Sequence, residues 1–196
     1  NIDRDTGRII DLLRELKIAD NTLVIFTSDN GPHQEGRHKM EFFDSNGPLR
    51  GMKRDLYEGG IRVPFIARWP GSVPAKKINH HISGFQDMFP TLLELAQIEL
   101  EHEVDGISMV PTLLGKKGQR KHDYLYWEFG ERGGATAVLK GDWKGVSRNT
   151  RKNPNGPIEL YNLKNDLAET TNLAENQKAL VAEFNAVLKR EHVSQE

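Results

Sequence analysis

Apolar residues recur at helical spacing at the start of the chain. The stripe consists of Ile2, Ile9, Ile10, Leu13 and Leu16. Charged side chains fill the opposite face, so an amphipathic helix is predicted that ends before residues 19–21. Residues 22–27 then form a short apolar run rich in β-branched side chains, typical of a strand buried on both faces of a parallel sheet. A helix followed by a buried strand indicates an open α/β sheet.

A long polar, glycine-rich stretch separates this strand from the next apolar run. It spans residues 28–60, and a stretch of this length without regular structure in a compact domain is often functional. Residues 61–69 are predicted to form a second strand, in which Pro64 indicates an edge position or an irregularity. Residues 87–96 are predicted to form a helix, with Asp87 near its N-cap.

The pattern changes near residue 119. Residues 116–121 are basic and poor in apolar side chains, so we expect a boundary between residues 1–118 and 119–196. Four short apolar runs follow and predict a small antiparallel sheet, at residues 124–129, 135–139, 143–146 and 158–161. Residues 173–188 are predicted to form a closing helix. The aromatic side chains Trp127, Trp143 and Tyr161 are expected to pack the sheet against that helix.

The composition narrows the classes of partner. The 196 residues include 27 basic and 28 acidic side chains, a formal net charge of -1, which argues against nucleic acid or an anionic membrane as a partner. The absence of cysteine excludes disulfides and thiolate chemistry. No apolar run approaches the roughly 18 residues that span a bilayer. The chain opens at Asn1 inside a helical pattern, so we expect a fragment or a processed product.

The first candidate site lies directly after the first predicted strand. In open α/β sheets, ligands bind beyond the carboxyl ends of the strands. Asp29 and Asn30 stand at that point and offer two oxygen ligands of the kind that calcium prefers. Taken alone, however, an Asp-Asn-Gly sequence is more often simply a turn.

The second candidate site is a cationic segment between glycines. Residues 47–64 hold four basic side chains, namely Arg50, Lys53, Arg54 and Arg62. A lysine suits a single anionic oxygen, and an arginine suits a bidentate clamp on an oxyanion. Composition alone favours a solvated charged loop, which is what most charge runs are.

Together these segments resemble the sulfatase family of the alkaline-phosphatase superfamily. Residues 27–31, TSDNG, match the end of a family strand, and residues 51–64 match Gly-x-Lys-x-x-x-x-Glu-Gly-Gly-x-Arg-x-Pro. The likeness continues through residues 87–93 (DMFPTLL), 105–114 (DGISMVPTLL) and 159–173 (ELYNLKNDLAETTNL), and so covers nearly the whole chain.

The resemblance implies a fold and a chemistry. Residues 1–118 would be the C-terminal half of the sulfatase α/β domain, a mixed sheet flanked by helices. Asp29 and Asn30 would be calcium ligands, and Lys53 would contact the sulfate and act in catalysis. The nucleophile, a formylglycine, would lie in a missing N-terminal part, so the fragment alone should bind calcium weakly and be inactive. By family analogy, the substrate would be a sulfate ester of a carbohydrate, and the location would be periplasmic or extracellular.

Other residues are weaker candidates. His33 and Arg50 are interpreted as possible substrate-binding residues, as are Glu35, Arg37 and His38, although each suits an ordinary loop. Ser72 precedes Val-Pro-Ala-Lys, which lacks the arginine and the position of the family's nucleophile motif, and is rejected. His80 and His81 are adjacent and make a poor chelate. Glu58 and Arg62 are expected to hold the glycine-rich turn together.

Three other functions stay open at this point. A phosphate-ester hydrolase of the same superfamily would need two transition metals, which Asp29 and Asn30 do not favour. A non-catalytic module could hold sulfated glycan through Arg50, Lys53 and Arg54. A structural fragment could complete a partner, either its own N-terminal half or a second copy, because a truncated sheet leaves apolar surface uncovered.

Overall fold

The computed structural model describes residues 1–192, and the chain folds as two compact units. The first contains residues 1–27 and 65–122, and the second contains residues 28–64 and 123–196. The glycine-rich stretch therefore belongs with the C-terminal sheet, whereas the sequence suggested a single cut near residue 118. No helix in the described part of the chain is long and apolar enough to cross a membrane.

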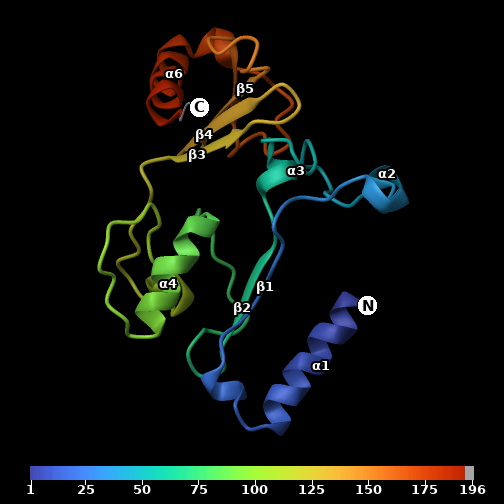
Figure 1. Cartoon of the computed structure of the whole chain (residues 1–196), viewed down its shortest axis with the longest axis vertical. Helices are drawn as coiled ribbons and strands as arrows, with labels where there is room; N and C mark the ends of the chain where they lie inside the picture. Colours follow the sequence, from blue (N-terminus) through green and yellow to red (C-terminus); the bar gives the residue numbers. More distant parts are fainter. Residues whose placement is uncertain (193–196) are drawn as a thin grey trace. The chain divides into compact units, whose positions relative to one another are not determined.

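The first unit begins with the expected amphipathic helix, α1 (Ile2–Glu15) (Figure 1). A 3₁₀ turn, η1 (Ala19–Asn21), leads into β1 (Val24–Thr27), which pairs with β2 (Phe65–Arg68). The pairing is antiparallel, with Val24 opposite Arg68 and Thr27 opposite Phe65. Phe26 is 36% exposed. The prediction of a parallel strand buried on both faces is therefore wrong for the described residues. The chain leaves β1, runs through residues 28–64 and returns as β2, which lies antiparallel to β1.

A second helix of this unit is anchored by a buried carboxylate. The 3₁₀ turn η3 (Phe85–Asp87) runs into α4 (Met88–Leu95), close to the predicted bounds. Asp87 is fully buried and accepts hydrogen bonds from the backbone N–H groups of Gly84 (2.9 Å) and Ile107 (2.7 Å), and its carboxylate lies 2.7 Å from His122 Nε2. These bonds tie α4 to the segment that ends in α5 (Val110–Leu113).

The second unit is built on a four-stranded antiparallel sheet. Its strands follow in order: β3 (Leu125–Phe129), β4 (Ala135–Lys140), β5 (Trp143–Arg148) and β6 (Ile158–Asn162). Each lies within about two residues of its predicted bounds. The closing helix, α6 (Lys178–Glu191), starts later than predicted because residues 174–176 form a separate 3₁₀ turn, η4 (Ala174–Asn176). The predicted small sheet with a C-terminal helix is confirmed.

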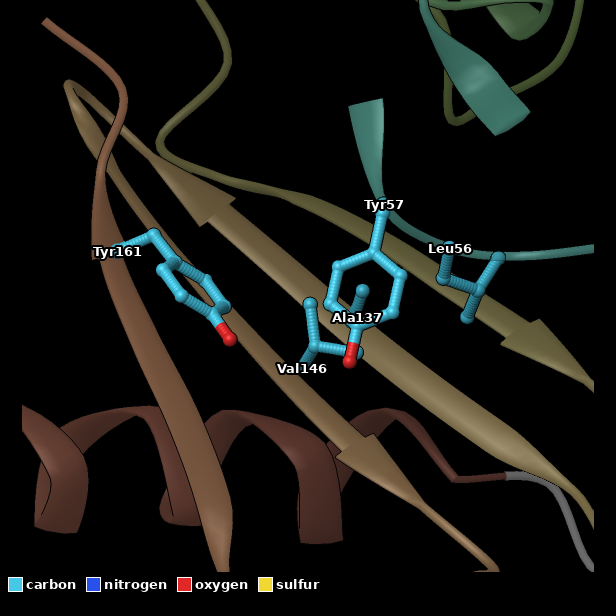
Figure 2. Close-up of a cluster of buried hydrophobic side chains, with 5 residues drawn as sticks. All are labelled: Leu56, Tyr57, Ala137, Val146 and Tyr161. Atoms are coloured by element: carbon cyan, nitrogen blue, oxygen red, sulfur yellow. The ribbon is translucent and has the colours of Figure 1, made fainter. Parts of the chain in front are cut away.

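The two faces of this sheet carry different layers, because side chains alternate along each strand. Val138 and Leu160 pack with Phe184 and Val187 of α6. Ala137, Val146 and Tyr161 point to the opposite face, where Leu56 and Tyr57 cover them (Figure 2). Trp143 lies on the α6 face as expected, but Trp127 and Tyr161 lie on the other one. Their predicted contact with the last helix is therefore wrong.

Short helical turns interrupt the 28–64 stretch. They are η2 (Glu35–Arg37), α2 (Met40–Phe43) and α3 (Glu58–Ile61). Ile61 therefore ends a helix instead of starting the second strand, which begins at Phe65. Residues 56–60 are all buried, so this part of the stretch is a packed element of the second unit and not a solvated loop.

Candidate functional site

The two glycine-rich segments meet backbone to backbone within the second unit. The N–H of Gly31 donates to the carbonyl oxygen of Gly60 at 2.9 Å, and the N–H of Lys53 donates to the carbonyl oxygen of Pro32 at 2.9 Å. A Cβ at Gly31 would stand 1.8 Å from the carbonyl oxygen of Gly59, so only glycine fits there. The contact brings Lys53 beside the chain segment that carries Asp29 and Asn30.

Asp29 and Asn30 follow the last residues of β1. Asp29 is exposed and Asn30 is half-buried. The Asn30 side-chain Nδ2 donates to the carbonyl oxygen of Gly31 at 3.1 Å, and Ser28 Oγ donates to the carbonyl oxygen of Asn30 at 2.8 Å. With its Nδ2 so engaged, Asn30 Oδ1 remains the group that can act as a ligand. The pair offers hard oxygen donors, which fits a cation such as calcium as part of a larger set.

The described residues do not complete such a set. Residues 1–192 contain no group of three or more His, Cys, Asp or Glu side chains placed to hold a metal ion. Burial lowers the pKa of His81, which keeps that ring neutral.

Lys53 shares a carboxylate with its neighbour Arg54. Glu35 Oε1 lies 2.5 Å from Arg54 Nη1, and Glu35 Oε2 lies 4.0 Å from Lys53 Nζ. The hydrogen bond and charge of Arg54, followed by the charge of Lys53, lower the pKa of Glu35. Arg54 adopts a left-handed backbone with φ 79°, a conformation uncommon outside glycine and often found at functional sites. The Lys53 side chain is 30% exposed and thus accessible.

His33 lies at the edge of this cluster, and Arg50 does not. His33 Nδ1 accepts a hydrogen bond from the backbone N–H of Glu35 at 3.0 Å. The Arg50 guanidinium instead stacks on the Tyr57 ring at 3.9 Å and donates to Tyr161 OH (2.8 Å) and to the carbonyl oxygen of Glu169 (3.0 Å). These contacts give Arg50 a structural task, and its role in substrate binding stays a prediction.

The sequence did not indicate which side chains elsewhere in the second unit hold these segments in place. Asn46 Nδ2 donates to the carbonyl oxygens of Leu49 and Gly51, both at 2.7 Å. Lys144, which is fully buried, lies 2.8 Å from Glu58 Oε1. The expected pair of Glu58 and Arg62 does form, at 3.0 Å. In the sequence, the only sign of a special role for Lys144 is its position within an apolar run. Its partner Glu58 becomes apparent only in the folded chain.

A cavity lies elsewhere in the second unit. It measures about 350 Å³ and is lined by residues of β4, α6 and the start of β3, including Lys140, Glu183 and Arg190. None of these is a candidate site residue, so the cavity does not alter the assignment.

Comparison with known proteins covers both units. Residues 1–98 match the family model Sulfatase, and residues 51–194 match the model for N-sulphoglucosamine sulphohydrolase, C-terminal. The chain is 44% identical to N-acetylgalactosamine-6-sulfatase from Sus scrofa over 115 residues, 58% of this chain and 22% of the relative. It is 42% identical to steryl-sulfatase from Homo sapiens over 130 residues, 64% of this chain and 22% of the relative.

A solved structure extends the likeness to the whole fold. Ps i-CgsB in complex with k-i-k-neocarrahexaose superposes with a TM-score of 0.83 and 29% identity, over 96% of this chain and 40% of that chain. The chain thus spans about a fifth of the length of the curated relatives it matches here, and less than half of this structural neighbour.

Proposed function

The chain belongs to the sulfatase family, and we propose that it supplies one part of a calcium-dependent site that hydrolyses sulfate esters. The observation that carries this proposal is the pair of backbone hydrogen bonds from Gly31 to Gly60 and from Lys53 to Pro32. They link the segment that carries Asp29 and Asn30 to the backbone of Lys53, and a pair of hard oxygen donors with a lysine is the combination proposed to bind a sulfate group.

In this proposal Asp29 and Asn30 hold the metal. Calcium takes about six to eight oxygen ligands, so these two residues contribute a minority and the others come from another part of a longer protein. When bound, calcium would polarise the sulfate oxygens as a Lewis acid. The Nδ2 of Asn30 donates to the Gly31 carbonyl, which leaves Oδ1 as the oxygen available to the metal.

Lys53 acts on the substrate in this proposal. Its ammonium group would contact the sulfate and stabilise negative charge on the departing oxygen, a kind of interaction that contributes much to catalysis when it is preorganised. The Lys53 backbone is fixed by its bond to Pro32, whereas its side chain meets Glu35 only at 4.0 Å and can turn to an anion. His33 borders the same cluster and is proposed as a contact for the rest of the substrate.

The nucleophile is proposed to stand outside these 196 residues. The family's formylglycine arises from Cys or Ser in a Cys/Ser-x-Pro-x-Arg motif, and this sequence contains no such motif. Residues 72–76, SVPAK, have lysine where arginine is needed. The chain alone is therefore expected to be inactive, and the remaining calcium ligands and the nucleophile would come from the same missing part.

We propose a sulfated carbohydrate as the substrate class. N-acetylgalactosamine-6-sulfatase is named for a sugar, and Ps i-CgsB was solved with a neocarrahexaose. Steryl-sulfatase, which is similarly close in sequence, is named for a sterol, so the two classes need to be compared directly. A periplasmic or extracellular location is proposed on family grounds alone.

The test compares this chain with the longest product of its gene. Both are assayed with calcium against a generic aryl sulfate, a sulfated N-acetylgalactosamine and a steryl sulfate. The proposal expects turnover only in the longer product, preference for the sugar, and a loss of roughly 100-fold or more in kcat for Lys53→Met. Lys76→Met is the matched control on an exposed loop and should be unchanged. Turnover by the 196-residue chain itself would contradict the proposal.

A further inference from the structure

A fully buried cation lies next to the glycine-rich turn of the second unit, which consists of residues 58–60. Lys144 of β5 is 0% exposed, and its Nζ lies 2.8 Å from Glu58 Oε1 and 3.0 Å from Glu169 Oε1. Its cross-strand neighbour is Tyr161, on the sheet face that Leu56 and Tyr57 cover (Figure 2). Taking charges out of water is costly unless each is paired in good geometry, so this cluster constrains its members closely.

The network holds the start of α3 at both its backbone and its side chain. Glu169 Oε2 accepts a hydrogen bond from the backbone N–H of Glu58 at 2.6 Å. The Glu58 carboxylate meets Lys144 through one oxygen and Arg62 through the other, at 2.8 and 3.0 Å. Two carboxylates and two cations thus form a neutral group, and Glu58 has little freedom to rotate or shift.

Glu169 is itself placed by a rigid turn. It is 0% exposed and has a left-handed φ of 53°, a conformation that a non-glycine residue adopts only when its surroundings impose it. Asp166 caps this turn by accepting hydrogen bonds from the backbone N–H groups of Thr170 (2.9 Å) and Thr171 (2.8 Å). Burial raises the pKa of Glu169, because a charged carboxylate loses its hydration at this position.

The turn that is held in this way leads directly to the candidate site. The N–H of Gly59 donates to the carbonyl oxygen of Arg50 at 2.7 Å, and the carbonyl oxygen of Gly60 accepts the N–H of Gly31. Gly31 follows Asn30, and the next residue, Pro32, accepts the N–H of Lys53. Each link is a backbone bond between buried or half-buried segments, so a shift at Glu58 moves both parts of the site.

We propose that Lys144 is a positioning residue, which sets the placement of Asn30 and Lys53 by holding Glu58 and Glu169 together beneath the glycine-rich turn. The chemistry of the site rests on the function proposed above, but the positioning does not. An apolar residue at 144 could fill the space, yet it could not fix the direction of two carboxylates. The C-terminal sheet therefore acts as a template for the site, although none of its strands carries a candidate site residue.

Hydrogen exchange measured by NMR on this chain tests the positioning without any reaction. The variant is Lys144→Met with Glu169→Gln, which removes one charge of each sign and leaves Glu58 paired with Arg62. The amides of Gly31 and Lys53 should then exchange at least 10-fold faster. The amides of Val138 and Leu160, in the sheet core, should keep their wild-type protection. Lys140→Met, which removes an exposed lysine of β4 that pairs with Glu183, is the matched control and should change neither set.

Two results would overturn the proposal. One is an equal loss of protection in the turn and in the sheet, which would make Lys144 a general stabiliser. The other is unchanged exchange at Gly31 and Lys53. If the double variant fails to fold, Glu58→Gln gives a second comparison, in which Lys144 keeps Glu169 while the ion pairs of Glu58 with Lys144 and Arg62 are lost. Arg62→Gln removes the Arg62 pair alone and is its control. In the longer product, the double variant should raise the calcium concentration for half-maximal activity at least 10-fold. If hydrogen exchange changes as expected but this concentration does not, the result counts against the proposed function and not against the positioning.

Discussion

Gly31 donates its backbone N–H to the carbonyl oxygen of Gly60 across 2.9 Å, and no side chain fits between the two segments. Two stretches that lie far apart in the sequence therefore touch at their backbones. This close approach explains why glycines cluster at residues 31, 59 and 60. It also makes Gly31 the most direct position at which to test the assembly of the site.

Gly31→Ala should destabilise the second unit, because the added Cβ would stand 1.8 Å from the carbonyl oxygen of Gly59. Overpacking of this kind costs roughly 1–3 kcal/mol, and backbone atoms cannot move aside as a flexible side chain can. Urea unfolding followed by tryptophan fluorescence measures the change. Gly7→Ala is the control, since nothing lies within 4 Å of its Cβ and helix α1 should gain roughly 0.5–1 kcal/mol. Similar effects of the two variants would contradict the close approach.

Glu35 should weaken anion binding at Lys53. Its carboxylate pairs with Arg54 at 2.5 Å and lies 4.0 Å from Lys53 Nζ, so it competes with any incoming sulfate. Glu35→Gln should raise the affinity of this chain for inorganic sulfate by roughly two- to five-fold, the scale expected of exposed ion pairs. Calorimetric titration measures the affinity, with Glu41→Gln in the nearby helix α2 as a control. A weaker affinity in Glu35→Gln would mean that Glu35 organises the cations for binding.

The stability of the second unit should fall between about pH 10 and pH 12. Burial, with a hydrogen bond to Glu159, raises the pKa of Tyr57 from 10.0 to about 12. The unfolded chain ionises first, so the stabilisation is complete below pH 10 and is lost as the pH rises through 12. A difference of two pKa units between the folded and the unfolded chain corresponds to roughly 2–3 kcal/mol in the free energy of unfolding. The free energy of unfolding measured against pH checks this.

Tyr57→Phe is the matched variant for that titration. It should lose roughly 1 kcal/mol at neutral pH, because the 2.5 Å hydrogen bond to Glu159 disappears. Above pH 10 its stability should fall less steeply than that of the wild type, with the residual slope arising from Tyr161, whose pKa burial also raises. An unchanged slope would show that Tyr57 does not stay neutral in the folded chain.

The apolar stripe of α1 should make this chain self-associate or bind apolar dyes. Ile2, Ile9 and Leu16 are 70%, 58% and 57% exposed, and the helix buries none of its residues. Exposed apolar surface on this scale marks a face that another element covers. Ile9→Gln with Leu16→Gln should reduce both dye fluorescence and sedimentation of larger species, whereas Arg8→Gln should change neither. A clean monomer with low dye binding would contradict this expectation.

Local patterns predicted the elements well, because periodicity and turn residues act over short distances. The amphipathic helix at residues 2–15 and the four strands of the small sheet follow from such patterns. The family resemblance, carried by the TSDNG and glycine-rich motifs, is confirmed by the two family models. The assignments of Asp29, Asn30, Lys53 and His33 stay predictions that now have a consistent geometry.

Long-range relationships were not predictable from the same patterns. The apolar run at residues 22–27 suits either a buried parallel strand or the antiparallel partner of β2, since composition reports burial only on average. The aromatic residue Tyr161 was assigned to the wrong face because one residue of register reverses a strand's side chains. The sequence could not identify the partners of Lys144, because Glu58 lies 86 residues before it and Glu169 lies in a later turn.

The order of these residues along the chain has a consequence for synthesis on the ribosome. Glu58 is translated 86 residues before Lys144 and 111 residues before Glu169. At about 5–20 residues per second, the glycine-rich turn waits on the order of ten seconds for the side chains that lock it. On the positioning proposed above, the segment carrying Asp29, Asn30 and Lys53 lacks its anchoring side chains during that interval. The last part of the chain to be made would therefore decide when the glycine-rich turn is fixed.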